Sequence, residues 1–209
     1  DGRLVVVGTD TDVGKTVVSA LLVQGLGASY WKPVQCGELE LGGDSGRVAG
    51  LTGLRRGSTP PCVLPEAYRL AAPASPNQAA RDEGISVDAS RLELPAVEGP
   101  LVVETAGGLL VPLRDDLMQI EQIKRWELPV LLVARSGLGT LNHTLLSLEA
   151  LAARTIPVLG LVLNGPLHPA NRETLETVGG APVLAELTPQ QELNQKTLQR
   201  VWDHAKLGS

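Results

Sequence analysis

The amino-acid sequence predicts an α/β fold, built on a doubly wound, mostly parallel sheet with helices on both faces. Two observations predict it. Short runs of branched apolar residues recur along the chain, and segments with an apolar spacing of about 3.6 residues lie between them. The apolar runs are continuous, which is typical of parallel strands that are buried on both faces. Strands that alternate with helices in this way form α/β folds.

Each predicted element follows from one of these two patterns. The predicted strands are residues 4–7, 29–34, 101–104, 130–134, 158–164 and 183–187. The predicted helices are residues 16–23, 45–51, 116–126, 141–154, 170–178 and 190–206. Residues 37–100 are rich in Gly, Pro and Arg, and we expect them to form short helices and loops over the sheet. This segment is too long for a simple connection in a compact domain, so we expect it to be functional.

The composition indicates a globular protein that binds neither nucleic acid nor a membrane. The 209 residues fit one domain over residues 1–209, and a hydrophobic content of 43% is enough to build a core. A formal net charge of -5 argues against general binding of nucleic acid. No apolar run approaches the roughly 18 residues that cross a bilayer, and no signal peptide is visible, so we expect a cytoplasmic protein. Cys36 and Cys62 show neither metal-site spacing nor a disulfide framework.

A phosphate-binding loop follows the first predicted strand. Residues 8–16 read Gly-Thr-Asp-Thr-Asp-Val-Gly-Lys-Thr and lead directly into a predicted helix. A glycine loop between a strand and a helix N-terminus offers backbone N–H groups to phosphate, as in the P-loop NTPase fold. We predict that Lys15 reaches the β- and γ-phosphates and that the Thr16 hydroxyl binds Mg²⁺. The general motif has its first glycine where this chain has Thr9, so this is a variant P-loop.

Charged residues at the ends of two further strands are predicted to face the same crevice, because ligands of parallel sheets lie beyond the carboxyl ends of the strands. Lys32 lies near the end of the second strand. Glu104 ends the third, where a carboxylate after an apolar run indicates a Walker-B metal ligand. Gly107 allows the backbone to approach a ligand closely. Asp44 has two equally weighted roles, as N-cap of the following helix or as a Mg²⁺ carboxylate.

The remaining strand ends carry less specific signals. Asn164 is followed by Gly165, and it either forms an ordinary turn or pairs its amide with a purine edge. Thr140 is predicted to cap a helix, and His143 is interpreted as structural. Residues 185–189 form another loop on the same rim of the sheet.

Taken together, these motifs resemble the dethiobiotin synthetase family. The resemblance rests on the motif at residues 8–16, on Lys-Pro-Val at 32–34, on Ala-Gly-Gly at 106–108 after Glu104, and on Asn164. It extends from the first strand to about Thr188. It implies an ATP-dependent ligase that closes a cyclic urea from 7,8-diaminononanoate and CO₂, through a carbamate and a carbamic–phosphoric anhydride. It also implies Mg²⁺, ATP as co-substrate, and a homodimer with the substrate site at its interface.

The resemblance also implies roles for individual residues. The implied catalytic residues are Lys15, Lys32 and Thr11. The implied nucleotide-binding residues are Asp12, Val13, Gly14, Lys15, Thr16, Val17, Asn164, Leu187, Thr188 and Pro189. The implied substrate residues are Thr11, Lys32, Cys36 and Gly107, with Gly139, Thr140, Leu141 and Asn142 at the end where the substrate meets the neighbouring subunit. The implied Mg²⁺ ligands are Thr16, Asp44 and Glu104.

Three positions depart from the family pattern. Cys36 stands where many relatives have Ser or Thr, Thr105 replaces a glycine of the usual Glu-Gly-Ala-Gly-Gly block, and residues 186–189 differ from the usual Glu-Ile-Pro order. The alternative function is that of a P-loop partitioning or targeting ATPase, which acts as a nucleotide switch on a membrane or DNA. Such ATPases carry a lysine early in the P-loop, whereas residues 8–11 of this chain contain none.

Overall fold

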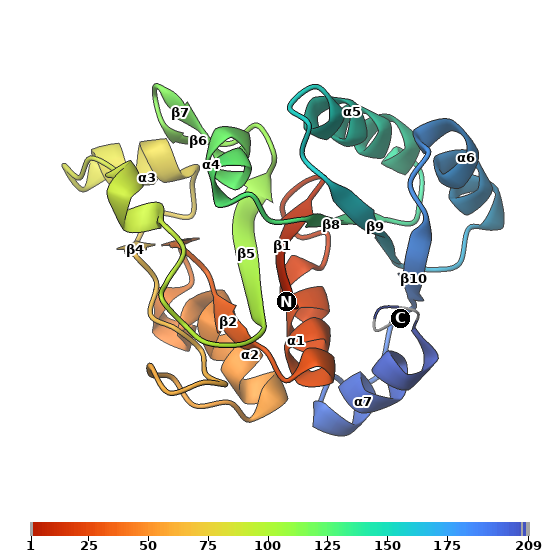
Figure 1. The fold of residues 1–209 in the computed structure, drawn as a ribbon, viewed down its shortest axis with the longest axis horizontal. Helices are drawn as coiled ribbons and strands as arrows, with labels where there is room; N and C mark the ends of the chain where they lie inside the picture. Colours follow the sequence, from red (N-terminus) through yellow and green to blue (C-terminus); the bar gives the residue numbers. More distant parts are fainter. Residues whose placement is uncertain (1, 206, 208–209) are drawn as a thin grey trace.

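A six-stranded parallel sheet forms the centre of the molecule (Figure 1). This computed structural model describes residues 2–205 and 207. The strands of the sheet are β1 (Arg3–Gly8), β2 (Ser29–Trp31), β5 (Leu101–Gly108), β8 (Val130–Arg135), β9 (Val158–Asn164) and β10 (Val183–Leu187). They lie in the order β10-β9-β8-β1-β5-β2, and every neighbouring pair is parallel. The predicted parallel sheet is confirmed.

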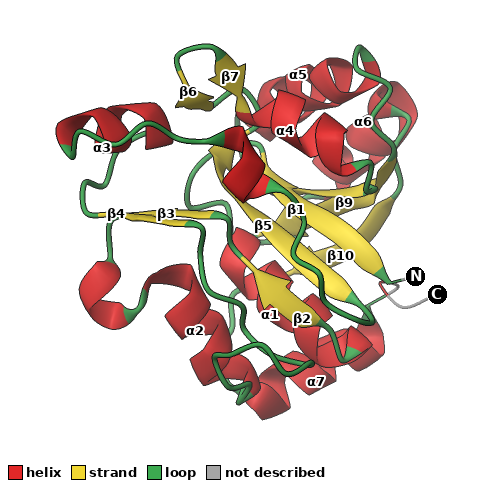
Figure 2. Ribbon diagram, turned by 60° about the vertical axis from the view of Figure 1, so that its left-hand side comes forward, coloured by secondary structure: helices red, strands yellow, loops and turns green. Residues whose placement is uncertain are grey.

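Helices cover both faces of this sheet (Figure 2). One face carries α1 (Lys15–Leu26), α2 (Gly43–Thr52) and α7 (Gln195–His204), and the other carries α4 (Gln119–Trp126), α5 (Thr140–Ala152) and α6 (Pro169–Gly179). In β1, Leu4 and Val6 pack toward α1, whereas Val5 and Val7 pack on the opposite face. All four are buried, which explains the continuous apolar run. Within the described residues, no helix has the length and apolar character needed to span a membrane.

The P-loop lies where the sheet reverses its direction of winding. From β1 the chain passes to β2 and β5 on one side, and it then crosses to β8, β9 and β10 on the other. The loop after β1 therefore opens at the point where ligands of doubly wound sheets bind. Gly14 is the N-cap of α1 and has a φ of 100°. Because glycine adopts this left-handed conformation without a steric penalty, it allows the sharp entry into α1.

A smaller layer lies at the β2 side of the sheet, at the left of Figure 1. It contains β3 (Val34–Cys36) paired in parallel with β4 (Tyr68–Leu70), α3 (Pro76–Asp82), the antiparallel pair β6 (Pro112–Arg114) and β7 (Leu117–Met118), and 3₁₀ turns at Leu39–Leu41 and Ala89–Leu92. Val34, Leu70 and Leu113 belong to its own apolar cluster. The short helices and loops predicted for residues 37–100 are confirmed, whereas β4 was not predicted.

The predicted strand 29–34 is wrong in its extent. β2 ends at Trp31, and Pro33 has no N–H with which to continue the ladder. Val34 then begins β3, which pairs with β4 and not with the central sheet. This break leaves Lys32 between the two sheets, outside the strands of both.

Two predicted helices are shorter in the structure. Residues 117–118 form β7, so α4 begins only at Gln119. α7 begins at Gln195, because the Asn194 side chain accepts a hydrogen bond of 3.0 Å from a backbone N–H of the first turn. The other end of that predicted helix, at Lys206, lies outside the described residues.

The two predicted side-chain caps are wrong. Gly42 and Gly139, with φ of 80° and 91°, occupy the N-cap positions of α2 and α5. Thr140 lies inside α5, where its hydroxyl pairs with that of Thr144 at 3.2 Å. Asp44 lies in the first turn of α2, and its carboxylate points toward α1. The N-cap alternative for Asp44 is therefore excluded.

Candidate nucleotide and metal site

Side chains from neighbouring strands support the P-loop. Asn164, at the end of β9, donates from Nδ2 to the carbonyl oxygen of Val13 at 3.0 Å. Arg135, at the end of β8, donates to the carbonyl oxygen of Thr11 at 3.3 Å. A Cβ atom on Gly14 would lie 2.1 Å from Nδ2 of Asn164, so glycine is required there. Both bonds are accepted by carbonyl oxygens of the P-loop, so they leave its backbone N–H groups available to a phosphate.

Three oxygen-bearing side chains from three elements converge beside the P-loop. The hydroxyl of Thr16 in α1 lies 3.0 Å from Oδ1 of Asp44 in α2 and 2.9 Å from Oε1 of Glu104 in β5. A hydroxyl carries one hydrogen, so it donates to one carboxylate at a time. Glu104 is 0% exposed, so protein groups must compensate its charge. The structure brings together the three residues predicted as Mg²⁺ ligands.

Lys32 supplies positive charge to this cluster. Its Nζ contacts the carboxylate of Asp44 and lies 3.2 Å from Oε1 of Glu104, and the residue is only 4% exposed. Burial alone would lower the pKa of Lys32, but Glu104 and Asp44 outweigh burial and raise this pKa above its ordinary value. Burial likewise favours a higher pKa for Asp44, and Lys32 outweighs it and lowers that pKa. Lys32 and Asp44 therefore remain an ion pair at neutral pH.

Lys15 reaches the same cluster from the start of α1. Its Nζ donates to the carbonyl oxygen of Asp10 at 2.8 Å, within the P-loop itself. Burial lowers the pKa of Lys15 to about 8, although the nearby charge of Glu104 opposes this shift. Asp12 is exposed and has a φ of 55°, and its charge also favours the charged form of Lys15. Lys15 forms no ion pair among the described residues, and a buried ammonium group of this kind is well suited to binding an incoming anion.

The oxygen set fits a hard divalent cation. Mg²⁺ binds carboxylate and hydroxyl oxygens, and in nucleotide sites it is held by one or two carboxylates together with phosphate and water. Thr16, Asp44 and Glu104 supply one hydroxyl and two carboxylates at one place. No group of three or more His, Cys, Asp or Glu residues that could hold a metal is found among the described residues. A metal here therefore needs further ligands from a hydroxyl, a phosphate or water.

Two polar residues of this cluster were not predicted from the sequence. Tyr30 donates its hydroxyl to Oε2 of Glu104 at 2.9 Å, and the side-chain oxygen of Gln35 accepts the N–H of Asp44 at 3.0 Å. Both side chains are buried, and both residues lie within three positions of Lys32 in the sequence. One signal was available for Tyr30, because it lies two residues before Lys32 and a buried tyrosine hydroxyl needs a hydrogen-bond partner.

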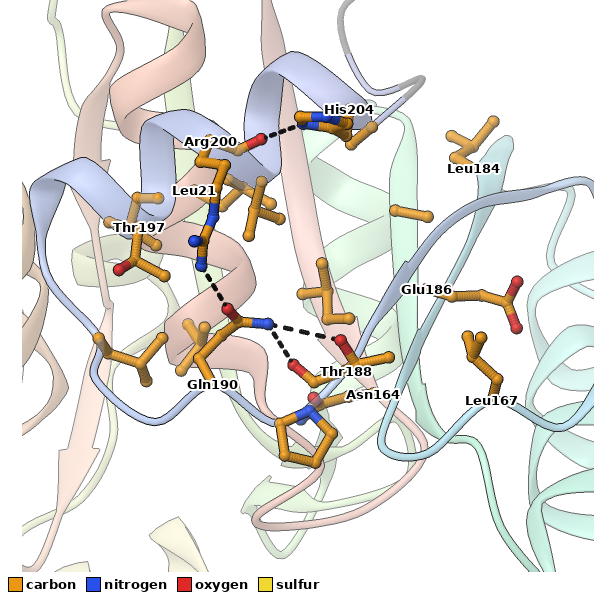
Figure 3. A pocket seen from close by; sticks show the side chains of 18 of the residues that line it. Leu21, Asn164, Leu167, Leu184, Glu186, Thr188, Gln190, Thr197, Arg200 and His204 are labelled. Carbon is orange, nitrogen blue, oxygen red and sulfur yellow. Dashed lines mark hydrogen bonds between the residues drawn. The ribbon is translucent and has the colours of Figure 1, made fainter.

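A cavity of about 730 Å³ adjoins the P-loop between α1, β10 and α7. Figure 3 shows a chain of hydrogen bonds in it, where Arg200 donates to Gln190 at 2.9 Å and Gln190 donates to the carbonyl oxygen of Thr188 at 2.8 Å. The predicted nucleotide residues that line this cavity are Val17, Asn164, Leu187, Thr188 and Pro189. The structure therefore brings these five residues together. Gln190 and Arg200 were not predicted as residues of a site.

A second cavity, of about 420 Å³, adjoins the start of the P-loop. Asp10 of the P-loop, Gly108 of β5 and Leu146 of α5 are among the residues that line it. Next to it, Gly107 has a φ of 59°, and a Cβ atom there would lie 3.4 Å from Oγ1 of Thr11. Gly107 and Thr11, both predicted to lie along the substrate, are thus neighbours in the structure.

The other predicted substrate residues make no hydrogen bond or ion pair with the metal-site residues among the described residues. Cys36 is half-buried in β3, and burial raises the pKa of its thiol to about 11 although Lys32 opposes this shift. The residues at the start of α5 are Gly139, Thr140, Leu141 and Asn142. Across residues 2–205 and 207, no hydrogen bond or ion pair joins these four to Thr16, Asp44 or Glu104. Their role at the substrate therefore stays a prediction.

The comparisons with known proteins agree with this geometry. A family model described as an AAA domain matches residues 2–197. The chain is 48% identical over 197 residues to the ATP-dependent dethiobiotin synthetase BioD of Rhodopseudomonas palustris (strain BisB18), covering 94% of this chain and 92% of that protein. It is 50% identical over 184 residues to the protein of the same name from Paramagnetospirillum magneticum, covering 88% of this chain and 86% of that protein.

A solved structure supports the fold. The crystal structure of a ParA family ATPase from Chlorobium tepidum TLS matches with a TM-score of 0.56 and 12% identity, over 99% of this chain and 91% of that chain. At this identity the likeness concerns the fold alone, and it confirms the predicted P-loop NTPase fold.

Proposed function

The chain belongs to the ATP-dependent dethiobiotin synthetase family, and we propose that it closes the cyclic urea of dethiobiotin by phosphoryl transfer from MgATP. It is an ATP-dependent ligase of biotin biosynthesis. The substrates we propose are 7,8-diaminononanoate, CO₂ and ATP, and the products are dethiobiotin, ADP and phosphate.

The proposed reaction has three steps. One amine of the diamine attacks CO₂, which forms a C–N bond and, with loss of a proton, a carbamate. A carbamate oxygen then attacks the γ-phosphorus of ATP, and the bond to the β-phosphate oxygen breaks as ADP leaves. This gives a carbamic–phosphoric anhydride. The second amine attacks its carbonyl carbon, phosphate leaves with the anhydride oxygen, and the ring closes with loss of a proton.

Positioning and charge neutralisation are the main demands of this chemistry. We assign the phosphates to the P-loop, with Asp12, Val13 and Gly14 providing backbone contacts and Lys15 neutralising the γ-phosphoryl oxygens. Thr16, Asp44 and Glu104 would hold Mg²⁺, which supplies positive charge to the β- and γ-phosphates when bound. The mutual approach of these three side chains supports this assignment.

Lys32 carries the second positive charge of the proposed site. It contacts both carboxylates of the metal site and is almost completely buried. We assign its ammonium group to the oxygens of the carbamate and of the anhydride, which are the anions that form during the reaction. Thr11, Gly107 and Cys36 are assigned to the wall along which the diamine lies.

The adenine base of ATP and the carboxylate end of the diamine substrate are assigned to separate surfaces. Adenine is assigned to the 730 Å³ cavity, where Asn164 and residues 187–189 meet. The residues at the start of α5 are assigned to the substrate carboxylate of a neighbouring subunit, because N–H groups at a helix start bind anions. This assignment requires a homodimer in which α5 of one chain faces the P-loop of the other.

One observation carries the proposal. Lys32 lies buried between the two carboxylates that also contact Thr16, so a second cation stands beside the phosphate-binding loop. The partitioning and targeting ATPases carry their additional lysine early in the P-loop itself, whereas the second lysine of this chain follows β2 and contacts the two carboxylates. A ligase with carbamate and anhydride intermediates needs additional positive charge where these anions form.

Release of phosphate from ATP tests the proposal directly. We expect release only when diaminononanoate and bicarbonate are both present, together with one dethiobiotin per phosphate by mass spectrometry. Omitting either substrate serves as the control. Vigorous hydrolysis without the diamine, stimulated by DNA or lipid vesicles, would contradict the ligase and favour the partitioning or targeting ATPase.

A further inference from the structure

The two carboxylate oxygens of Glu104 have different surroundings. Oε1 faces the P-loop side, where the Thr16 hydroxyl lies at 2.9 Å and Nζ of Lys32 at 3.2 Å. Oε2 faces the interior, where the hydroxyl of Tyr30 donates to it at 2.9 Å. Because Glu104 is 0% exposed, water cannot replace the bond from Tyr30 without a rearrangement of the core. One oxygen is therefore turned toward the proposed metal, and the other is held by a tyrosine.

The strand register brings Tyr30 to this position. Tyr30 of β2 lies opposite Val102 of β5, two residues before Glu104. Residues two apart on a strand share a face, so Val102 and Glu104 point to the same side of the sheet as Tyr30. Tyr30 is 0% exposed and packs in the apolar cluster beneath α1, which also contains Val18. The packed ring thus holds the hydroxyl at a fixed place.

We propose that Tyr30 is a positioning residue of the metal site, whose hydroxyl holds the Glu104 carboxylate so that Oε1 faces Thr16 and Mg²⁺. This inference rests on the assignment of Glu104 to Mg²⁺ in the proposed function. The terminal torsion of a glutamate is broad, so a carboxylate with no bond to Oε2 turns more freely. Partners behind a metal ligand typically change metal affinity by about 10- to 100-fold.

Tyr30→Phe separates positioning from packing, because phenylalanine fills the same volume and lacks only the hydroxyl. Calorimetric titration of ADP with and without Mg²⁺ gives the factor by which the metal strengthens ADP binding. In Tyr30→Phe we expect this factor to fall about 10-fold, while the affinity for ADP without metal stays within about twofold of the native value. Neither measurement requires turnover.

The matched control is the other tyrosine of the chain, since the sequence contains only two. The Tyr68 hydroxyl accepts the N–H of Asp88 at 2.8 Å, in the smaller layer of the fold. Tyr68→Phe removes a buried hydroxyl of the same kind, so it can lower the melting temperature. We expect it to leave the effect of Mg²⁺ on ADP binding unchanged.

A second measurement does not depend on the stability of Tyr30→Phe. Incorporation of 3-fluorotyrosine gives two ¹⁹F resonances, and Tyr68→Phe assigns them by removing one. Addition of Mg²⁺ to the ADP complex should shift the Tyr30 resonance and leave the Tyr68 resonance in place. An unmoved Tyr30 resonance would overturn the proposal, as would a Tyr30→Phe protein that binds ADP with the native dependence on Mg²⁺.

The failure of this inference is distinguishable from the failure of the proposed function. The diamine is absent from both measurements, so a chain that binds MgADP and forms no dethiobiotin refutes the ligase alone. A native chain whose affinity for ADP ignores Mg²⁺ refutes the assignment of Glu104 to the metal, and the inference about Tyr30 with it.

Discussion

At the scale of single residues, the charge of the buried Lys32 is balanced by one buried carboxylate, Glu104, and one partly exposed carboxylate, Asp44. Asp44 and Glu104 both contact Lys32, and Glu104 has no exposure to water. Breaking a buried ion pair by removing one partner is strongly destabilising, because the remaining charge is left uncompensated. A second cation that binds the same carboxylates can restore the stability that is lost when Lys32 is removed.

Lys32→Met is therefore expected to make the stability of the protein depend on Mg²⁺. Without metal we expect a loss of about 3 kcal/mol in the free energy of unfolding. With MgADP most of the loss should be recovered, because a ligand that binds only the folded state stabilises it. Urea unfolding with and without MgADP measures both values.

Lys124→Met, on the exposed side of α4, is the control and should change stability by no more than about 0.5 kcal/mol. A Lys32→Met protein that is equally stable in both conditions would show that the carboxylates do not share their charge with a metal.

Cys36 is expected to react slowly with alkylating reagents. Burial raises the pKa of its thiol from 9.0 to about 11, and the thiolate is the reactive form. Two pH units correspond to about 100-fold less thiolate at pH 8, so iodoacetamide should modify Cys36 about 100-fold more slowly than the unfolded chain. Peptide mass spectrometry separates Cys36 from Cys62, which is also buried and serves as an internal reference. Modification of Cys36 at the rate of the unfolded protein would contradict its burial.

The sequence predicted the charged residues and the residues of known motifs better than the polar residues that hydrogen-bond to them. Lys15, Thr16 and Glu104 carry chemistry that a motif describes, and the structure brings them together. Tyr30 was missed because its partner, Glu104, lies 74 residues away in the sequence, and Gln35 was missed because its contact with Asp44 forms only once α2 packs against β3. The spacing of Tyr30 from Lys32 indicates that its hydroxyl needs a partner, but only the pairing of β2 with β5 identifies that partner as Glu104.

At the scale of elements, the contact between α1 and α7 forms one wall of the 730 Å³ cavity. Gln24 of α1 donates to the carbonyl oxygen of Gln195 at 3.0 Å and to the side chain of Gln199 at 3.1 Å. Next to it, the absence of a side chain at Gly25 makes room for the ring of Trp202, since a Cβ atom there would lie 2.0 Å from that ring. The position of α7 against α1 therefore depends on Gly25.

Gly25→Ala is expected to displace α7 and to weaken nucleotide binding. The added methyl group cannot be accommodated without moving Trp202, and such overpacking costs about 1–3 kcal/mol. Because α7 lines the cavity assigned to adenine, we also expect a lower affinity for ADP. Tryptophan fluorescence and calorimetry measure the two effects. Unchanged stability and affinity would mean that α7 is not seated as the structure shows.

Gly50→Ala is the matched control for this substitution. Gly50 lies in α2, and no heavy atom lies within 4 Å of the place that a Cβ atom would take, so an added methyl group meets open space. Alanine is the better helix former by about 1 kcal/mol, so this variant should gain stability by roughly that amount. The opposite signs of the two Gly→Ala variants would separate crowding against Trp202 from helix propensity.

Element types were easier to predict than element ends. Continuous apolar runs predicted the strands β8 and β9 almost residue for residue, because burial on both faces leaves a strong pattern. β10 was predicted as accurately, although it is an edge strand whose residues are alternately buried and half-buried. The ends were decided by single residues whose effect is local. Pro33 ended β2 early, and Asn194 delayed the start of α7. The pairing of β3 with β4 joins segments far apart in the chain, which no periodicity reveals.

At the scale of the whole molecule, exposed apolar residues near α5 are the surface that we assign to the proposed homodimer interface. Leu110 is 55% exposed and Leu146 is 56% exposed, and both line the 420 Å³ cavity beside the P-loop. Leu138, in the loop before α5, is completely exposed. The same region carries the residues Gly139 to Asn142, which make no hydrogen bond or ion pair with Thr16, Asp44 or Glu104 among the described residues. An interface at α5 would both cover Leu110, Leu138 and Leu146 and complete the proposed substrate site.

Leu146→Glu is therefore expected to prevent formation of the proposed homodimer and to stop ring closure while leaving nucleotide binding intact. A charge in an apolar interface is costly to bury, whereas the cavity assigned to adenine lies within one chain. Light scattering should show the native protein at twice the mass of one chain and the variant at the mass of one chain. Val178→Glu, at an apolar residue of α6 that is 68% exposed, is the control and should remain dimeric and active. A monomeric variant that still forms dethiobiotin would show that the substrate site is complete in one chain, and a monomeric native protein would remove the need for an interface at α5.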